Sequence, residues 1–350
     1  MLELVKTLVA EHGVSGYEHS IRELIISLLP EKTKYSVDNL GNLIVTVGAE
    51  TKVGTKKRIA GLLFLAHMDE LGFVVSEVRN DGFIKIKSLG GIDPRIMPGK
   101  ILRIKTEKGE VRGVVGIKPP HLMGEERAKE MGAVIPIEDL YLDIGASSAE
   151  EVYSMGVSIL NPVTFDKSFE VLNKKYIVSR GLDDRAGCAV MLKAIETLSG
   201  EKLKGTVHFA FTVQEERGLR GAELVGAEVT ADYAFAIDTA SCGDIPQARK
   251  DFAPAVLGKG PALRAVDNRH ISDERFVKEV RRVAEENGIP TQLIFTGGST
   301  DAAAVETRGP KSLPICFPVR YTHSTVEMIS SEDLENSLKL VLALVRHYLC

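Results

Sequence analysis

The sequence predicts an α/β protein in which a small all-β domain interrupts the chain. Strand-like apolar runs alternate with amphipathic helical patterns near both ends of the chain, and short alternating strands replace them in the middle. The 350 residues suffice for about two domains. We therefore expect a discontinuous α/β domain at residues 1–72 and 163–350, with the all-β domain at residues 73–162. A single continuous α/β domain is the alternative.

Composition is ordinary for a globular protein, with 44% hydrophobic residues, 26% charged residues and a net charge of -4. The charge does not indicate a nucleic-acid partner, and no apolar run has the length of a transmembrane span. The N-terminal segment lacks a signal-peptide cleavage site, which favours a cytoplasmic location. The four cysteines lack CxxC spacing, so we expect free thiols and no thiolate zinc site.

The N-terminal part reads as two helices and a hairpin. The first helix covers about Leu2 to Glu11. Ser15 and Glu18 have the spacing of a capping box, which predicts a second helix over roughly residues 17–29. The segment 37–48 is typical of a hairpin that turns at Asn39–Asn42.

A Lys-rich link, residues 51–58, leads into a continuous apolar run at residues 59–66. Such a run is typical of a central strand that is buried on both faces. The segment His67-Met68-Asp69-Glu70 follows directly, so a histidine stands at the predicted end of a buried strand.

The middle of the chain consists of short alternating segments, FVVSEV, FIKIKSL, KILRIKT and GEVRGVVGI, which are separated by Gly, Pro and charged turns. The first long helical signal after them is a capping box at Ser148–Glu151. This pattern predicts a β-barrel or a β-sandwich of about ninety residues.

Strands and helices alternate again after Pro162. The expected elements are a helix at 186–198, a strand at 206–214, a strand at 232–237 that stops at Asp238, a helix capped by Ser272 that runs to Asn287, a strand at 312–320, and a helix at 332–348 capped by Ser330.

Chemically active side chains follow five of the predicted strands. They are His67, Asp183, the adjacent pair Glu215 and Glu216, Asp238, and His323. Sites in open α/β sheets form outside the carboxyl ends of the strands, so residues far apart in the chain can meet at one edge. Each residue alone is more commonly a cap or a surface residue, but five such coincidences are improbable.

Two histidines and several carboxylates, without cysteine, suit a divalent ion such as zinc, cobalt or manganese. One ion needs about three protein ligands. The larger set favours two ions that share a carboxylate and a water molecule. The segment 297–301 lacks the lysine and the spacing of a phosphate-binding loop, and we interpret it as a turn that lines the site.

The chain resembles the M42 family of dinuclear metalloaminopeptidases, the tetrahedral (TET) aminopeptidases, which include glutamyl aminopeptidases. The resemblance covers essentially the whole chain, and its motifs are specific as an ordered set. These are HMDELGF (67–73), GLDDRAG (181–187), TVQEERGLRGA (212–222), AID (236–238), GKGPAL (258–263), RYTHS (320–324), GVSGYE (13–18) and VRGVVGIKPPHL (111–122).

The resemblance implies a role for each matching residue. His67 and Asp238 would hold one ion, Glu216 and His323 the other, and Asp183 would bridge them. Glu215 would be the general base, and Asp69 would orient the imidazole of His67. Arg217, Ser299 and the segment 239–242 depart from the usual family pattern, which concerns substrate preference rather than the ligands.

The resemblance further implies a mixed-sheet metallopeptidase domain with an inserted, barrel-like dimerisation domain, and a tetrahedral dodecamer built from dimers. The expected activity is removal of N-terminal amino acids from short peptides, with two divalent ions per subunit, zinc or cobalt in the first place and manganese as an alternative. Two rival functions remain: a non-catalytic scaffold stabilised by metal, and a glycoside hydrolase that uses Glu215 and Glu216 as its carboxylate pair.

Overall fold

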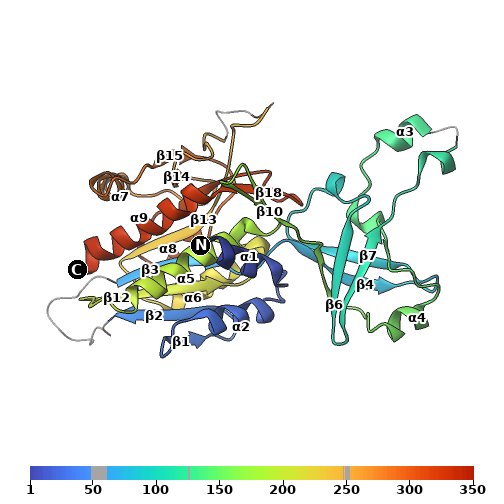
Figure 1. Cartoon of the computed structure of the whole chain (residues 1–350), viewed down its shortest axis with the longest axis horizontal. Coiled ribbons are helices and arrows are strands. Elements are labelled where there is room, and N and C mark those ends of the chain that lie inside the picture. The colour runs from blue at the N-terminus through green and yellow to red at the C-terminus, as the bar shows by residue number, and fades with distance from the viewer. Residues whose placement is uncertain (49–60, 125–126, 247, 249–252) are drawn as a thin grey trace. The chain divides into compact units, whose positions relative to one another are not determined.

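A computed structural model describes residues 1–48, 61–124, 127–246, 248 and 253–350 (Figure 1). The chain forms two compact units. The first, called here the sheet unit, comprises Met1–Glu70, Phe169–Thr322 and Val326–Cys350. The second, the barrel unit, comprises Leu71–Ser168 and His323–Thr325. The predicted Lys-rich link at 51–58 and the first two residues of the predicted strand at 59–66 lie outside the described residues.

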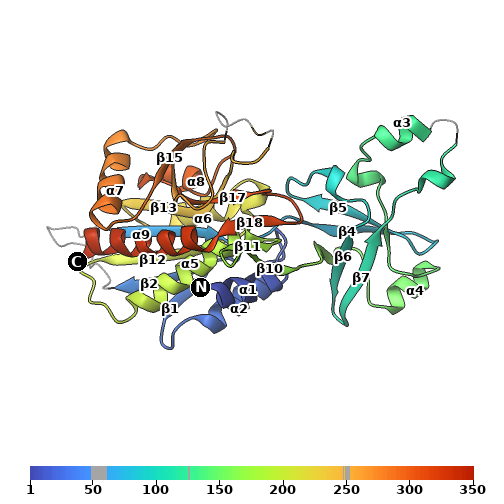
Figure 2. The same cartoon turned by 45° about the horizontal axis from the view of Figure 1, so that its top comes forward.

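The sheet unit is built on a mixed sheet of twelve described strands, nine of which follow the order β1-β2-β12-β3-β13-β17-β18-β11-β10 (Figures 1 and 2). The strands are β1 (Lys34–Val37), β2 (Leu43–Gly48), β3 (Gly61–His67), β10 (Phe169–Leu172), β11 (Tyr176–Ser179), β12 (Thr206–Thr212), β13 (Tyr233–Ser241), β14 (Ala262–Val266), β15 (Gln292–Phe295), β16 (Lys311–Ser312), β17 (Ile315–Arg320) and β18 (Glu327–Ser330). The hairpin predicted to turn at Asn39–Asn42 is the β1–β2 hairpin.

Helices cover both faces of this sheet. They are α1 (Leu2–Ala10), α2 (His19–Leu28), α5 (Leu182–Leu198), α6 (Arg220–Glu228), α7 (Glu274–Glu286), α8 (Ala302–Glu306) and α9 (Ser331–Leu349). On one face Phe64 stacks between Phe209 and Phe235, at centroid distances of 5.4 and 5.2 Å, in a core that includes residues of α1, α5 and α9. On the other face, Leu63 and Leu65 pack with residues of α6 and α8. Alternate residues of β3 therefore enter two cores, as its uninterrupted apolar sequence requires.

The central strands bring the candidate site residues to one edge of the sheet. β12, β3, β13 and β17 run parallel to one another, so their carboxyl ends lie at one edge of the sheet. Thr212, the last residue of β12, is paired with His67, the last residue of β3. Segments that leave these strands therefore start close together, which is the arrangement that the strand-end argument assumes.

Three local predictions are wrong because a longer-range contact or pairing decides the local structure, and a fourth is wrong because Ser330, at the N-cap position of α9, makes no side-chain capping hydrogen bond. α2 begins at His19, since Ser15 does not cap it and instead donates its hydroxyl to the carboxylate of Asp69 at 2.6 Å. α7 is capped by Asp273, whose carboxylate accepts the N–H of Phe276, and not by Ser272. β13 does not stop at Asp238 but continues to Ser241, because β17 pairs with it along this length.

The barrel unit is a closed barrel in the order β4-β5-β8-β7-β6-β9. Its elements are β4 (Gly72–Val78), β5 (Ile84–Leu89), β6 (Ile101–Thr106), β7 (Gly109–Val115), α3 (Arg127–Gly132), β8 (Leu142–Asp143), α4 (Ala149–Ser154) and β9 (Pro162–Phe165). Ile84 and Ile86 face the interior while Lys85 and Lys87 alternate with them, as expected for a strand with one buried face. Ser148 caps α4 as predicted, with its hydroxyl oxygen accepting the N–H of Glu151.

The predicted fold class, a mixed α/β sheet domain together with a small β-barrel, is confirmed. All four cysteines are free. None of the helices that the structure describes combines the length and the hydropathy that a bilayer-spanning segment requires.

Candidate metal centre

His67 stands at the centre of a cluster of acids at the carboxyl edge of the sheet. It is the last residue of β3 and is 2% exposed. Its Nε2 lies 3.2 Å from Oδ1 of Asp183 and 4.0 Å from Oε2 of Glu215. Its Nδ1 lies 3.0 Å from the main-chain carbonyl oxygen of Asp69, which fixes the ring and directs Nε2 at the acids.

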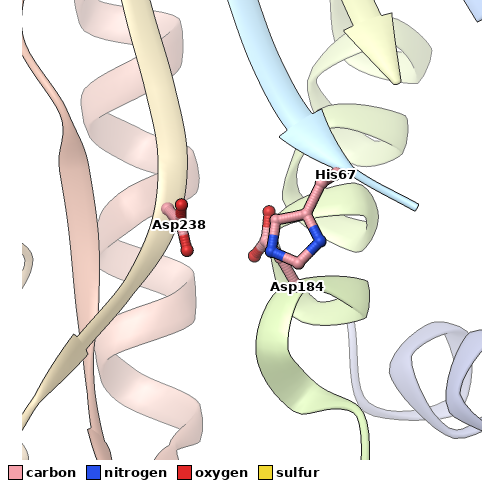
Figure 3. A group of neighbouring side chains, drawn as sticks. All are labelled: His67, Asp184 and Asp238. Carbon is pink, nitrogen blue, oxygen red and sulfur yellow. The ribbon is translucent and has the colours of Figure 1, made fainter. Parts of the chain in front are cut away.

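Two groups of side chains around His67 have the arrangement of metal ligands. In each group one ligand atom per residue lies within 4.8 Å of every other. The first group is His67, Asp184 and Asp238, and the second is His67, Asp183 and Glu216. Figure 3 shows that the first group draws its residues from three separate elements, β3, the start of α5 and β13. An imidazole binds an ion through one ring nitrogen, and Nδ1 of His67 already faces the carbonyl oxygen of Asp69, so His67 can serve one ion while the remaining carboxylates serve a second.

Asp183 is held from several sides. Its main-chain N–H donates to Glu327 at 3.2 Å, and Glu327 is paired with the guanidinium of Arg180 at 3.0 Å in a fully buried ion pair. The hydroxyl of Thr322 donates to the carboxylate of Asp183 at 3.1 Å. These contacts leave the carboxylate little freedom to turn away from His67.

Asp184 is not among the candidate ligands that the sequence predicts. It is fully buried and belongs to the first ligand group. Its Oδ1 accepts the N–H of Gly187 at 3.1 Å. A Cβ atom at position 187 would lie 2.4 Å from this oxygen, so Gly187 is the residue that allows the carboxylate to approach α5 so closely. The available signal was the pair of adjacent acids, Asp183-Asp184, in the segment 181–187.

The segment 213–217, called here the Glu215 turn, follows β12 and includes a single turn of 3₁₀ helix at Glu215–Arg217. The side chain of Glu215 is 11% exposed. The carboxylate of Asp69 accepts the main-chain N–H groups of Glu215 at 2.9 Å and of Glu216 at 3.2 Å. Asp69 therefore contacts both the imidazole of His67, through its carbonyl oxygen, and the backbone of the Glu215 turn, through its carboxylate.

Asp301 is a further buried acid near this cluster. It lies at the end of the segment 297–301, for which the sequence predicts a turn that lines the site, and is 2% exposed. The hydroxyl of Thr212 donates to its Oδ2 at 2.5 Å, while its Oδ1 has no hydrogen-bond partner among the described residues. The charge of Asp301 contributes to the raised pKa of Glu215.

His323 is a member of neither ligand group. It belongs with Ser324 and Thr325 to the barrel unit, whereas all the residues of the two groups belong to the sheet unit. The predicted ligand role of His323 therefore stays a prediction, as do the individual roles predicted for the other candidates.

The electrostatics of the cluster favour a bound cation. Burial raises the pKa of Asp238 to about 7, with the neighbouring charge of Asp183 adding to the effect. Burial and the charge of Asp238 raise the pKa of Asp184, and burial raises that of Glu215 well above its ordinary value. Burial lowers the pKa of His67, but the hydrogen bonds with Asp183 and Asp69 outweigh it and hold the pKa well above its usual range.

These shifts mean that the cluster holds more carboxylate groups than one imidazolium can neutralise. Divalent cations would supply the missing positive charge, and the oxygen and nitrogen donors fit zinc, cobalt or manganese. The donor set therefore fits a centre for divalent cations. A metal centre at the carboxyl edge of an α/β sheet is compatible with a metal-dependent hydrolase.

Comparison with known proteins identifies the family. The model of the M42 glutamyl aminopeptidase family matches residues 41–340. A lysyl aminopeptidase of Pyrococcus furiosus is 33% identical, over 98% of this chain and 96% of the relative. A dodecamer structure of PhTET1 is 41% identical and covers 99% of this chain and 98% of its own, with a TM-score of 0.89.

A second structure, of the TET1 peptidase of Pyrococcus horikoshii, is 42% identical, covers 98% of each chain and also has a TM-score of 0.89. That peptidase can assemble into a tetrahedron or a large octahedral shell. The present chain belongs to the M42 peptidase family. It is accordingly a metal-dependent aminopeptidase, a hydrolase that acts on peptide bonds.

The acid cluster predicts how stability depends on pH in the metal-free protein. Asp184 and Asp238 have folded-state pKa values above the unfolded ones, so the folded chain binds more protons from about pH 4 to about pH 7, and the raised pKa of His67 adds to this effect only above about pH 6.5. The free energy of unfolding should therefore fall as the pH rises through this window. Asp69, whose pKa is lowered, has the opposite effect, but only around and below about pH 4.

Thermal unfolding of chelated protein between about pH 5 and about pH 8 measures this dependence. We expect the melting temperature to fall with rising pH, and the gain on adding zinc or cobalt to grow, because cations favour the ionised ligands. Asp238→Asn should flatten the dependence in the metal-free protein. A melting temperature that rises with pH across this range in the metal-free protein would contradict the proposed electrostatics.

Proposed function

We propose that this aminopeptidase removes N-terminal amino acids from short peptides, with two divalent cations per subunit and Glu215 as general base. Zinc and cobalt suit the donor set best, and manganese is the alternative. The observation that carries the proposal is the pair of ligand groups that share His67, with Glu215 beside them and a member of neither.

The proposed ligands are His67, Asp183, Glu216, Asp238 and His323. Asp183 suits the bridging role because it adjoins His67 in one group and its charge acts on Asp238 and Asp184 of the other. His323 follows Thr322 directly in the chain, and the Thr322 hydroxyl contacts Asp183. Asp184 adds a buried carboxylate that further stabilises the two cations.

When bound, two divalent ions lower the pKa of a shared water molecule and polarise the scissile carbonyl group. The carboxylate of Glu215 accepts one proton from the attacking water, and the oxygen adds to the carbonyl carbon. As the C–N bond breaks, Glu215 returns this proton to the leaving amine, and a free amino acid and a shortened peptide result. Burial of Glu215 raises its pKa, which makes it a stronger base than an exposed glutamate.

The geometry disfavours the two rival functions. In glycoside hydrolases two carboxylates flank the scissile bond, whereas Glu215 and Glu216 are neighbours on one 3₁₀ turn. A glycosidase mechanism also gives no role to the buried imidazole of His67. A non-catalytic scaffold would need the ligands, but it would not need a buried glutamate that belongs to neither ligand group.

We further propose that the chain forms a homo-oligomer in the cytoplasm, a tetrahedral dodecamer in which barrel units pair to form dimers. The dodecamer of PhTET1 and the tetrahedral assembly of the Pyrococcus horikoshii peptidase support this proposal.

An aminoacyl-anilide assay tests the function directly. Metal-replete protein should release the chromophore from a panel of aminoacyl anilides, a chelator should abolish the release, and zinc or cobalt should restore it. Release of sugar from cellulose in the presence of chelator would favour the glycosidase instead. Absence of both activities from folded, metal-replete protein would favour the scaffold.

Glu215→Gln separates the base from the ligands. It should lower kcat by about 10²- to 10⁴-fold, because proton transfer is lost, while metal content stays at the wild-type level. Glu216→Gln is the matched variant on the same turn and should lower metal content as well. Near-normal activity of Glu215→Gln would show that another group takes the proton.

His323→Ala tests the ligand that lies outside the two groups. We expect elemental analysis after dialysis to show less bound metal per chain than in the wild type, since one ion loses its imidazole ligand. His19→Ala, at an exposed position on α2, is the control and should retain the wild-type metal content. Full metal retention by His323→Ala would remove His323 from the ligand set.

A further inference from the structure

The Glu215 turn begins with four consecutive main-chain N–H groups that donate to side-chain oxygens. The N–H of Val213 donates to Oδ1 of Asn42 at 3.0 Å, and that of Gln214 to Oε1 of Glu18 at 3.0 Å. The next two, of Glu215 and Glu216, donate to Asp69 at 2.9 and 3.2 Å. The strand β12 has ended at Thr212, so these donors no longer face a neighbouring strand.

Three separate parts of the chain supply these acceptors. Asn42 lies just before β2, Asp69 just after β3, and Glu18 just before α2. Buried main-chain donors require partners, and successive N–H groups that converge on an anionic oxygen form a favourable nest. Side chains outside the turn therefore help to determine its backbone path, together with main-chain hydrogen bonds such as that from Gly221 to Val213 at 3.0 Å. Gln214 has the left-handed backbone conformation, with φ of 55°, which is unfavourable for a residue other than glycine. The hydrogen bond from its N–H to Glu18 helps to stabilise this conformation.

The carboxylate of Glu18 is buried and accepts two main-chain hydrogen bonds. The residue is 5% exposed, and its Oε1 also accepts the N–H of Gly16 at 2.8 Å. Two residues before Gly16, Val14 forms a bridge with Glu70, and Ser15 donates to Asp69 at 2.6 Å. The segment 14–18 is thus held beside the residues that follow β3. Oε1 of Glu18 connects this segment to the Glu215 turn.

The close packing of the turn leaves little room for adjustment. A Cβ atom at Gly221, at the start of α6, would lie 2.3 Å from Oδ1 of Asn42 and 2.4 Å from the carbonyl oxygen of Val213. Asn42 in turn donates its amide to the carbonyl oxygen of Gly221 at 3.0 Å. The turn is therefore confined on the α6 side, and Glu18 fixes its position at Gln214, immediately before the proposed base.

We propose that Glu18 is a positioning residue for Glu215: by holding the N–H of Gln214, it sets the place from which the proposed base takes its proton. This inference rests on the proposed function. Glu18 belongs to neither ligand group, so its loss should change the geometry of proton transfer more than the number of bound ions. A small displacement of a reacting group lowers the rate steeply without weakening substrate binding to the same degree.

Hydrogen exchange of the metal-free protein tests the contact without reference to activity. In Glu18→Ala the backbone amides of a peptide that covers residues 211–219 should exchange about tenfold faster than in the wild type, because the Gln214 donor has lost its acceptor. Glu18→Gln keeps an acceptor oxygen and should remain within about threefold of the wild type. Glu23→Ala, at an exposed position on α2, is the control and should match the wild type.

Steady-state kinetics of metal-replete protein on an aminoacyl anilide test the role. We expect Glu18→Ala to lower kcat at least about tenfold, with KM within about threefold and metal content unchanged. Glu18→Gln should restore most of kcat. Glu18→Asp keeps the charge but retracts the oxygen by one methylene, and it should behave like Glu18→Ala. It also serves as the test variant where Glu18→Ala does not fold.

Wild-type exchange and wild-type kcat in Glu18→Ala or in Glu18→Asp would overturn the proposal. So would a loss of metal in proportion to the loss of activity, because Glu18 would then act on the ligands and not on the base. If the wild type itself hydrolyses no aminoacyl anilide, the proposed function fails. The exchange experiment still decides whether Glu18 holds the turn.

Discussion

The concentration of buried carboxylates around one imidazole is the constraint on which the rest of this structure depends. Asp183, Asp184 and Asp238 are each at most 6% exposed, and Glu215 and Glu216 adjoin them on the neighbouring turn. Charges of one sign buried together destabilise the fold unless protons or cations neutralise them. Protonation would remove ligands and base alike at neutral pH. Divalent cations resolve the conflict, and they supply the Lewis acid that an aminopeptidase needs.

A site of this kind also requires a backbone that resists the repulsion between its acids. Parallel strands bring His67 and Asp238 to one edge, but Asp183 and Glu215 lie beyond the last residues of β11 and β12. Side chains hold the backbone at these two places. Glu327, paired with Arg180, accepts the N–H of Asp183, and Asp69 accepts those of Glu215 and Glu216. The same acids that add negative charge to the region thus also determine where the reactive carboxylates stand.

Much of the fold and part of the site could be predicted from the sequence. Two local patterns predict site residues: the continuous apolar run before His67, and the paired acids after β12. They do so because the carboxyl ends of parallel strands in α/β sheets converge. Asp184 was missed because a strand-end argument selects one residue per strand, while only the path of the chain shows that both acids of the pair turn inwards. The spacing of Ser15 and Glu18 predicts a capping box. In the structure the hydroxyl of Ser15 donates to Asp69, just after β3, and the carboxylate of Glu18 accepts the N–H of Gln214, just after β12. Contacts between residues so distant in sequence leave no local pattern.

The central claim, that the acid cluster exists to hold two cations, is tested most directly by the number of ions bound. Wild-type protein equilibrated with zinc or with cobalt, dialysed against metal-free buffer and analysed by inductively coupled plasma mass spectrometry should contain two ions per chain. Asp183→Asn, which removes the proposed bridge, should contain fewer. One ion or none in folded, active wild-type protein would contradict the account.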